Sequence, residues 1–275
     1  ALCRRQEGAS LQPSITNVHN TIMTTFCIIT CTYNAEKELP RTLESVGGQS
    51  YGSVCHIIID GASSDKTVAL ASAYADNNHS SHTVKVVSEK DNGLYDAMNK
   101  GIRLSEGDYI LFLNAGDTFA DRYTLERIAT QISNIGGREL PAVIYGKTDI
   151  VDNDGNFLRH RRLQPPETLT WKSFLNGMLV CHQAFYARRD LAQDTPYDLS
   201  YRLSADVDWC IRIMKEAGKK GLALHNTHLT LCRYLEGGMS VKSHRASLIE
   251  RFLIMKKHYG LFRTLLVHLW FIIRK

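Results

Sequence analysis

The sequence lacks both glycine-rich motifs that hold nucleotide phosphates in the commonest nucleotide-binding folds. No G-x-G-x-x-G pattern follows the first predicted strand, and no G-x-x-x-x-G-K-[ST] pattern occurs in the 275 residues. The phosphates of a nucleotide ligand would therefore need another counter-charge, either a metal ion or basic side chains.

Paired cysteines are also missing. The seven cysteines are scattered and none forms a C-x-x-C pair. Most lie inside apolar runs, where a reduced cysteine packs as a small hydrophobic side chain. This usage indicates a reducing, cytoplasmic compartment and disfavours a zinc site or a disulfide framework.

Long hydrophobic runs and a strong charge imbalance are absent as well. No stretch approaches the roughly 20 apolar residues that span a bilayer. The net charge of +5 does not indicate a nucleic-acid partner, and membrane phosphates or a phosphorylated substrate fit it equally well. Residues 1–22 show neither a signal-peptide core nor a regular period, so we expect a poorly ordered leader before a compact domain that starts at Met23.

Short apolar runs alternate with helical patterns through the first half of the chain. Strands buried on both faces that alternate with helices are typical of a mostly parallel sheet in an α/β/α sandwich. The later part predicts a hairpin arm, a strand within "CHQAFYARR", a helix that ends at Gly218 and two helices broken near Gly260. The strands predicted in the first half are 26–31, Val54–Asp60, Thr83–Ser88 and Asp108–Asn114, and a helix near 121–135 follows the last of them.

Polar side chains stand where these predicted strands end. In an open parallel sheet, ligands bind outside the carboxyl ends of the strands. Carboxylates or amides at several such ends together favour a binding site there. The residues concerned are Thr32, Tyr33 and Asn34 after the first strand, Asp60 after the second, Glu89, Lys90 and Asp91 after the third, and Asn114 and Asp117 after the fourth.

Five segments in a fixed order resemble the family 2 inverting glycosyltransferases with the GT-A fold. They are "CTYNAEKELPRTLESV", "IIIDGASSDKT", "EKDNGLYDAMNKG", "DYILFLNAGD" and "ADVDWCIRI". "GLYDAMNKG" and "HQAFYARR" are most similar to the branch that builds bacterial surface polysaccharides. The resemblance implies a GT-A domain at 23–240, with a nucleotide-binding half at about 23–118 and an acceptor half at about 119–240, followed by C-terminal basic amphipathic helices at 241–275.

The resemblance also implies a function. The protein would move a sugar from a nucleotide diphospho-sugar, a UDP-sugar first of all, to a saccharide or lipid-linked saccharide in cell-surface polysaccharide synthesis. Asp60 would accept the imide N–H of a uracil-type base; alternatively it caps the next helix, although Ser63, Ser64 and Asp65 offer caps too. The residues expected to hold the donor are Thr32, Tyr33, Asn34, Glu36, Asp60, Lys90, Asn99, Lys100 and Asn114.

The metal motif departs from the family pattern. Where the family commonly has "LDADD", this chain has "LNAGD", so Asn114 and Gly116 replace two acids and Asp117 remains. One carboxylate can still hold Mg²⁺ or Mn²⁺, because these ions keep water ligands and also bind diphosphate oxygens. We therefore expect Asp117 to be a metal ligand, with Lys90 or Lys100 sharing the neutralisation of the diphosphate, and helix capping is the alternative role for Asp117.

The segment "ADVDWCIRI" resembles the family's "ED-x-D-x-x-x-R". Asp206 and Asp208 are the expected catalytic acids: Asp206 falls on the position of the catalytic base, with Asp208 as the alternative base. If Asp206 is the base, Asp208 is expected to act in orientation or at the helix N-terminus, where the dipole favours a carboxylate. Acceptor or phosphate contacts are assigned to His182, Gln183 and His244; a buried structural role is equally open for His182.

The C-terminal segment mixes Leu, Ile, Phe and Trp with basic residues. Helices of this composition can lie in a membrane interface, which would place the protein peripherally on the inner face of the cell membrane. Packing on the catalytic domain or a homodimer contact are the alternatives. For the whole chain, a sugar nucleotidyltransferase and a catalytically inactive nucleotide-sugar-binding protein remain as other functions.

Overall fold

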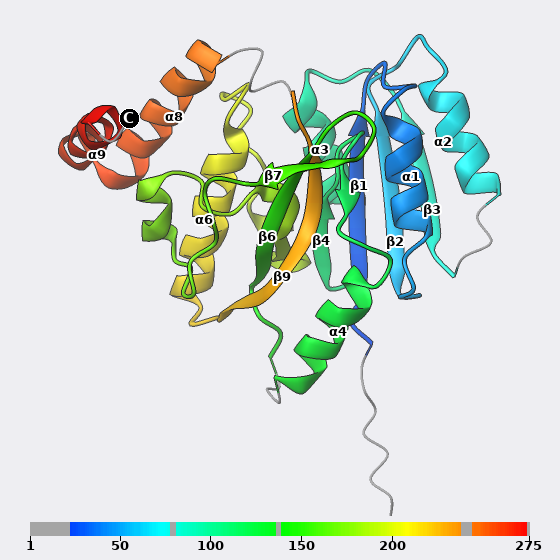
Figure 1. Ribbon diagram of the computed structural model, residues 1–275, viewed down its shortest axis with the longest axis horizontal. Coiled ribbons are helices and arrows are strands. Elements are labelled where there is room, and N and C mark those ends of the chain that lie inside the picture. Colours follow the sequence, from blue (N-terminus) through cyan, green and yellow to red (C-terminus); the bar gives the residue numbers. More distant parts are fainter. Residues whose placement is uncertain (1–22, 78–80, 136–138, 238–243, 274–275) are drawn as a thin grey trace, which may run out of the picture.

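A computed structural model describes residues 23–77, 81–135, 139–237 and 244–273; the predicted leader at 1–22 lies outside these residues. Within them, nine strands form one continuous sheet (Figure 1). Its order is β3-β2-β1-β4-β8-β6-β9-β5, and β7 pairs with β6 as the predicted hairpin arm.

The first four strands pair in parallel, as the sequence predicts. Every residue of the first strand is buried, because its apolar side chains pack on both faces of the sheet. The register sets Thr32 opposite Asp60 and Asp60 opposite Ser88, so these polar side chains share one edge. The strands are β1 (Phe26–Thr32), β2 (Val54–Asp60), β3 (Thr83–Ser88) and β4 (Tyr109–Phe112), and the crossing helices are α1 (Leu39–Gly47), α2 (Thr67–Asp76) and α3 (Leu94–Leu104).

The second half of the sheet is mixed. β8 runs antiparallel to both β4 and β6, and β9 is parallel to β6, so β6 and β9 run in the same direction as β4. The sequence does not predict β9, because polar residues interrupt it and much of it is only half-buried. These strands are β5 (Thr118–Phe119), β6 (Val143–Val151), β7 (Phe157–His160), β8 (Phe185–Arg188) and β9 (Leu224–Leu235).

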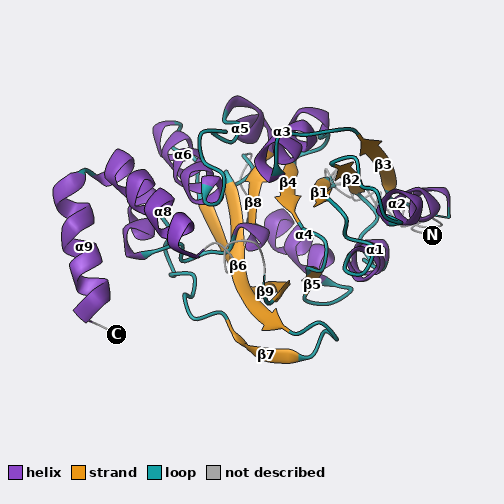
Figure 2. Cartoon of the chain, turned by 90° about the horizontal axis from the view of Figure 1, so that it is seen from above, coloured by secondary structure: helices purple, strands orange, loops and turns teal. Residues whose placement is uncertain are grey.

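Helices cover both faces of the sheet, with α3, α5 and α6 along one face and α1 and α4 along the other (Figure 2). Gly260, at φ 84°, separates the last two helices at the predicted break. In the described part of the chain, no helix has the length and apolar character needed to cross a membrane. The remaining helices are α4 (Thr124–Asn134), η1 (Trp171–Asn176), η2 (His182–Ala184), α5 (Arg189–Asp194), α6 (Ala205–Lys219), α8 (His244–Tyr259) and α9 (Leu261–Ile273).

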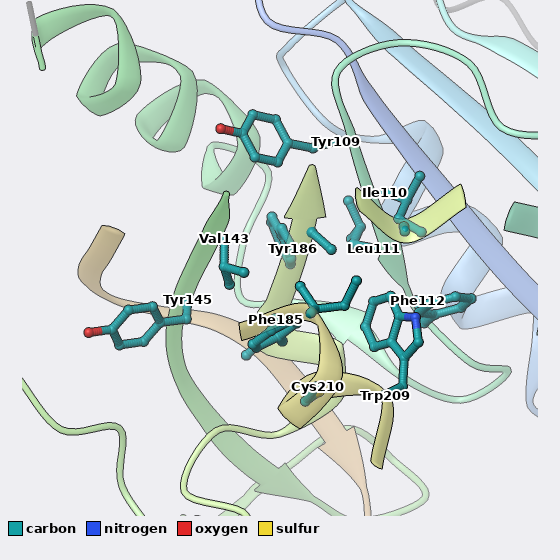
Figure 3. Close-up of a cluster of buried hydrophobic side chains, with 14 of the residues drawn as sticks. Tyr109, Ile110, Leu111, Phe112, Val143, Tyr145, Phe185, Tyr186, Trp209 and Cys210 are labelled. Carbon is teal, nitrogen blue, oxygen red and sulfur yellow. The ribbon is translucent and has the colours of Figure 1, made fainter. Parts of the chain in front are cut away.

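An aromatic cluster fixes α6 to the sheet (Figure 3). Trp209 is completely buried, and its ring centroid lies 5.7 Å from that of Phe112 on β4 and 5.8 Å from that of Phe185 on β8. Tyr197 stacks on Trp209 at 5.0 Å. Burying aromatic rings in such edge-on and offset pairs is strongly stabilising, so the start of α6 has a defined position at the end of β4.

The first turn of α6 is also bound to α8. The buried carboxylate of Asp208 accepts from His258 Nε2 at 2.8 Å, from Lys257 Nζ at 3.1 Å and from Arg212 Nε at 2.6 Å. Burial by itself would raise the pKa of Asp208, but these hydrogen bonds and the charge of Arg212 hold the pKa well below its usual range. Asp208 therefore carries a negative charge that joins two helices.

A second contact from α8 supports the residues just before α6. The Glu250 carboxylate accepts the backbone N–H groups of Arg202, Leu203 and Ser204 at 2.9, 2.8 and 2.9 Å. Backbone N–H groups at a helix start have no partner within the helix. α8 therefore supplies the acceptor for the chain that enters α6.

Asp208→Asn should lower the free energy of unfolding by about 2–3 kcal/mol at neutral pH, since it removes the buried negative charge that Arg212 and Lys257 bind. Because the folded-state pKa of Asp208 is depressed, its stabilisation is present above the unfolded-state pKa of about 4 and is lost as pH falls further. Urea unfolding at pH 7 and at about pH 2, well below the unfolded-state pKa, measures this difference. Glu216→Gln, which removes a more exposed ion pair on the same helix, is the control. An equal loss at both pH values would show that charge is not the cause.

Candidate functional site

The strand directions bring separate parts of the chain to one edge of the sheet. The carboxyl ends of β1, β2 and β4 lie there, and so does the carboxyl end of β9. Because β8 runs against β4, its start meets the end of β4, and η2 immediately before β8 joins the same edge. The predicted convergence of polar strand ends is thus present, with two further contributors.

Asp60 is completely buried at the end of β2, and the chain itself fills its acceptor positions. Ser63 donates from its backbone N–H at 2.9 Å and from its hydroxyl at 2.5 Å, Ser88 Oγ donates at 2.8 Å and Thr32 Oγ1 at 3.1 Å. Burial opposes ionisation, but these bonds lower the pKa of Asp60 below its ordinary value. A carboxylate offers about four lone-pair sites, so in this structure Asp60 holds the three strand ends together.

The loop after β1 is bound to the loop after β2. Asn34, in the left-handed region at φ 47°, accepts the Ser64 N–H on Oδ1 at 2.9 Å, and Glu36 Oε2 accepts the Lys66 N–H at 3.1 Å. The start of α2 has its own acceptor, because Asp65 Oδ1 accepts the Thr67 N–H at 2.9 Å. Asn34 and Glu36 therefore shape the two loops.

Tyr33 differs from its neighbours, since 67% of its side chain is exposed. It borders Gly61: a Cβ at Gly61 would lie 3.4 Å from Tyr33 Cδ2 and 2.6 Å from Asp91 Oδ2. Gly61 thus allows Tyr33 and Asp91 to approach each other across the backbone. Exposed at the sheet edge, the Tyr33 ring offers a flat surface on which a base could stack.

The residues after β3 that are predicted to contact the nucleotide-sugar donor lie in two different environments. Lys90 is exposed, and its carbonyl accepts from Lys100 Nζ at 2.9 Å; the same ammonium pairs with Glu89 at 2.9 Å. Asn99 instead lies in the interior, where its amide exchanges hydrogen bonds of 3.0 and 2.7 Å with the backbone of Tyr197. In this structure both ends of the Asn99 amide bind the chain itself, and its predicted contact with the sugar donor stays a prediction.

Asp117 is buried, with only 3% of its surface exposed. Its Oδ2 accepts from Gln183 Nε2 at 2.9 Å and its Oδ1 from the Leu235 N–H at 3.0 Å. Burial raises the pKa of Asp117 to about 7, although both hydrogen bonds oppose the shift. The carboxyl group joins the ends of β4 and β9 to the start of β8.

Asp117 faces the interior of the protein in this structure and does not present an open metal position. Both oxygens of Asp117 already accept hydrogen bonds, and Gly116 has φ 97° with Leu235 so close that a Cβ would lie 2.5 Å from Leu235 Cδ2. A side chain at position 116 would therefore strain the backbone and displace Leu235. Among the described residues, no three His, Cys, Asp or Glu side chains form a metal-binding group. Asn114 Oδ1 is buried there without a hydrogen-bond partner from the described chain.

Asp206, in the first turn of α6, is partly accessible, with 18% of its side chain exposed. Its Oδ1 accepts from the Tyr95 hydroxyl at 3.2 Å, and His182 Nδ1 lies 3.7 Å from its Oδ2. Burial lowers the pKa of His182, while the charge of Asp206 acts in the opposite direction. A partly accessible carboxylate thus lies beside a hydroxyl and an imidazole.

The adjacent residues of η2 connect the two acids of the site. His182 faces Asp206 and Gln183 binds Asp117. Asp208, two residues after Asp206, points instead to α8 and is inaccessible, which favours Asp206 over Asp208 as the base. The side chain of His244 lies outside the described residues, and its predicted phosphate contact stays a prediction.

Sequence reasoning missed two contributors. Tyr95 lies within the segment "GLYDAMNKG", and its hydroxyl joins that segment to Asp206. Cys181 donates from Sγ to Gln183 Oε1 at 2.7 Å and so orients the amide toward Asp117. Tyr95 stood inside a recognised motif, whereas nothing local to Cys181 indicated its contact.

Comparison with solved structures shows the same fold. Residues 1–349 of Staphylococcus aureus TarS superpose with a TM-score of 0.66 at 16% identity, covering 90% of this chain and 72% of that one. The mannosyltransferase PcManGT from Pyrobaculum calidifontis, solved with GDP-Man and Mn²⁺, gives a TM-score of 0.63 at 14% identity, covering 90% and 71%.

Sequence comparison is more specific. A "PGL/p-HBAD biosynthesis glycosyltransferase" of Mycobacterium bovis is 33% identical over 217 residues, which is 78% of each chain. The "Amylovoran biosynthesis glycosyltransferase AmsB" of Erwinia amylovora is 30% identical over 196 residues, 69% of this chain and 64% of that one. The family model "Glycosyl transferase family 2" matches residues 27–195. The chain therefore belongs to glycosyl transferase family 2 and is a glycosyltransferase with the GT-A fold.

Proposed function

We propose that the protein transfers a sugar, with inversion, from a nucleotide diphospho-sugar to a hydroxyl of a saccharide or lipid-linked saccharide. The observation that carries this proposal is the position of Asp206. It is a partly accessible carboxylate in the first turn of α6, next to the edge where the strand ends meet, and it is held by Tyr95 beside His182.

Asp206 is assigned the role of general base. It takes the proton of the acceptor hydroxyl as the hydroxyl oxygen bonds to the anomeric carbon, while the bond from that carbon to the diphosphate oxygen breaks. Since attack and departure occur on opposite faces of the sugar, one transfer inverts the anomeric configuration. The Tyr95 hydroxyl fixes one Asp206 oxygen and leaves the other, next to His182, for the acceptor.

A UDP-sugar is the proposed donor. TarS, which shares the fold, has been solved with UDP-GlcNAc, whereas the mannosyltransferase was solved with GDP-Man. The exposed Tyr33 ring and the loops joined by Asn34 provide a place for a base at the end of β1. Titrating UDP, GDP and dTDP, each with and without Mn²⁺, tests the donor directly. Binding of none of them would overturn the proposed transfer.

The proposal includes a saccharide or lipid-linked acceptor, reached at the inner face of the cell membrane, and the names of the relatives support the type of product. The mycobacterial relative is named for PGL/p-HBAD biosynthesis and the Erwinia relative for amylovoran biosynthesis. Both names describe carbohydrate-bearing products, which supports the assignment to surface polysaccharide or glycolipid synthesis.

Asp206→Asn should leave nucleotide-sugar affinity unchanged and lower the transfer rate by about 10²–10⁴-fold, the usual contribution of a positioned general base. The amide keeps the shape of the side chain but cannot take up a proton. Calorimetric donor binding and a transfer assay measure the two effects. Asp194→Asn, at an acid that is 75% exposed, is the matched control. Unimpaired transfer by Asp206→Asn would remove the base from this mechanism.

Asp60→Asn should reduce both UDP affinity and the unfolding midpoint, because the same carboxylate orders the loops around the proposed base site. Ser88→Ala, which removes one of the four hydrogen bonds to Asp60, should show the same two effects more weakly. Thermal unfolding and UDP titration check this. If Asp60→Asn abolishes UDP binding but leaves the thermal unfolding midpoint unchanged, Asp60 contacts the nucleotide base directly.

Asp117→Asn should flatten the dependence of stability on pH. Because the folded-state pKa of Asp117 is raised to about 7, its contribution to stability is full below about pH 4 and is lost as pH rises through 7. Relative to the wild type, the variant should therefore gain stability between pH 5 and pH 8 in urea unfolding. If instead Mn²⁺ raises the midpoint of the wild type alone, Asp117 turns outward to hold the metal, as the sequence predicts.

A further inference from the structure

The outward face of α9 is apolar. Six large side chains on this helix are between 49% and 75% exposed. Their positions recur at intervals of three and four residues, so they line one side of the helix. They are Leu261, Phe262, Leu265, Leu266, Leu269 and Trp270, which together we call the α9 apolar face.

The opposite side of α9 makes the contacts with α8. Thr264 is completely buried, and the His268 ring lies 5.1 Å from the Phe252 ring. The apolar face therefore points away from the protein. Both ribbon views place α9 at one end of the molecule, beyond α8 and far from α2 (Figures 1 and 2). Contiguous exposed apolar surface of this kind marks an interaction site.

The charges around this face have one sign. Residues 244–273 contain five Lys or Arg side chains and a single acid, Glu250. The Glu250 carboxylate is held by three backbone N–H groups before α6 and so is not presented beside the apolar face. Arg245, Lys256 and Arg263 are exposed.

We infer that α8 and α9 form a docking surface for an anionic phospholipid bilayer, with the α9 apolar face entering the interface. Exposed apolar side chains next to basic ones suit such a surface, where anionic headgroups attract Lys and Arg. A second copy of the chain fits less well, because joining two of these faces would bring like charges together. This inference rests on the proposed function, in which the acceptor is lipid-linked.

The docked helices would also position the catalytic helix. α8 holds the entry of α6 through Glu250 and its first turn through Asp208. Asp206 lies between these two attachments. A bilayer bound by α9 would therefore be linked through α8 to the helix that carries Asp206.

Co-sedimentation of the full chain with vesicles tests the inference. Binding is expected with phosphatidylcholine–phosphatidylglycerol vesicles, weaker binding with phosphatidylcholine alone, and a decrease as salt rises. The triple variant Phe262→Ser, Leu266→Ser, Leu269→Ser should lower the membrane partition coefficient by about 100-fold. This value assumes that each of the three side chains contributes about half the free energy of full burial when the helix lies in the interface. Phe157→Ser with Leu158→Ser, exposed apolar residues on β7, is the matched control and should bind normally.

Two further measurements separate the outcomes. Arg263→Gln with Lys256→Gln should weaken binding to anionic vesicles and leave binding to phosphatidylcholine alone unchanged. Analytical ultracentrifugation should show a monomer; a dimer that the triple variant dissociates would assign the face to a second copy and overturn the inference. Failure of the intact chain to bind anionic vesicles would also overturn it. None of these measurements requires a nucleotide-sugar or catalytic turnover. The membrane inference can therefore be disproved while the protein still transfers a sugar to a soluble saccharide.

Discussion

The antiparallel placement of β8 between β4 and β6 is the constraint on which the site depends. Had β8 continued the parallel pattern, η2 would lie at the opposite edge of the sheet. Because the chain reverses here, Gln183 reaches Asp117 and His182 reaches Asp206. Two acids separated by 89 residues of sequence are thereby connected through neighbouring residues of one short helix.

The sequence predicted the parts of this structure that depend on local pattern. Apolar runs located the first four strands because buried strands need them, and the carboxylate at Asp60 marked the strand end correctly. The sequence could not show that Thr32, Ser63 and Ser88 would donate hydrogen bonds to Asp60, since two of these residues lie on other strands. Whether a polar side chain faces a ligand or its own chain depends on such distant partners.

Asp206 and Asp208 illustrate the same limit at one turn of helix. Both are acids near a helix N-terminus, and the dipole favours both alike. Their roles differ because His258 and Lys257, about 50 residues later in the chain, lie beside Asp208 alone. Asn99 shows a similar limit: its partner in this structure is the backbone of Tyr197, and the side-chain pattern of a sequence does not indicate backbone partners.

The three hydrogen bonds to Glu250 bear on how the protein is made. During synthesis the chain emerges from its N-terminal end, and domains generally fold as units in that order. The N–H groups of residues 202–204 have their acceptor on α8, more than 40 residues later. The start of the helix that carries Asp206 is therefore completed only after α8 has been made. The sheet can assemble earlier, but the proposed catalytic geometry forms with the last helices of the chain.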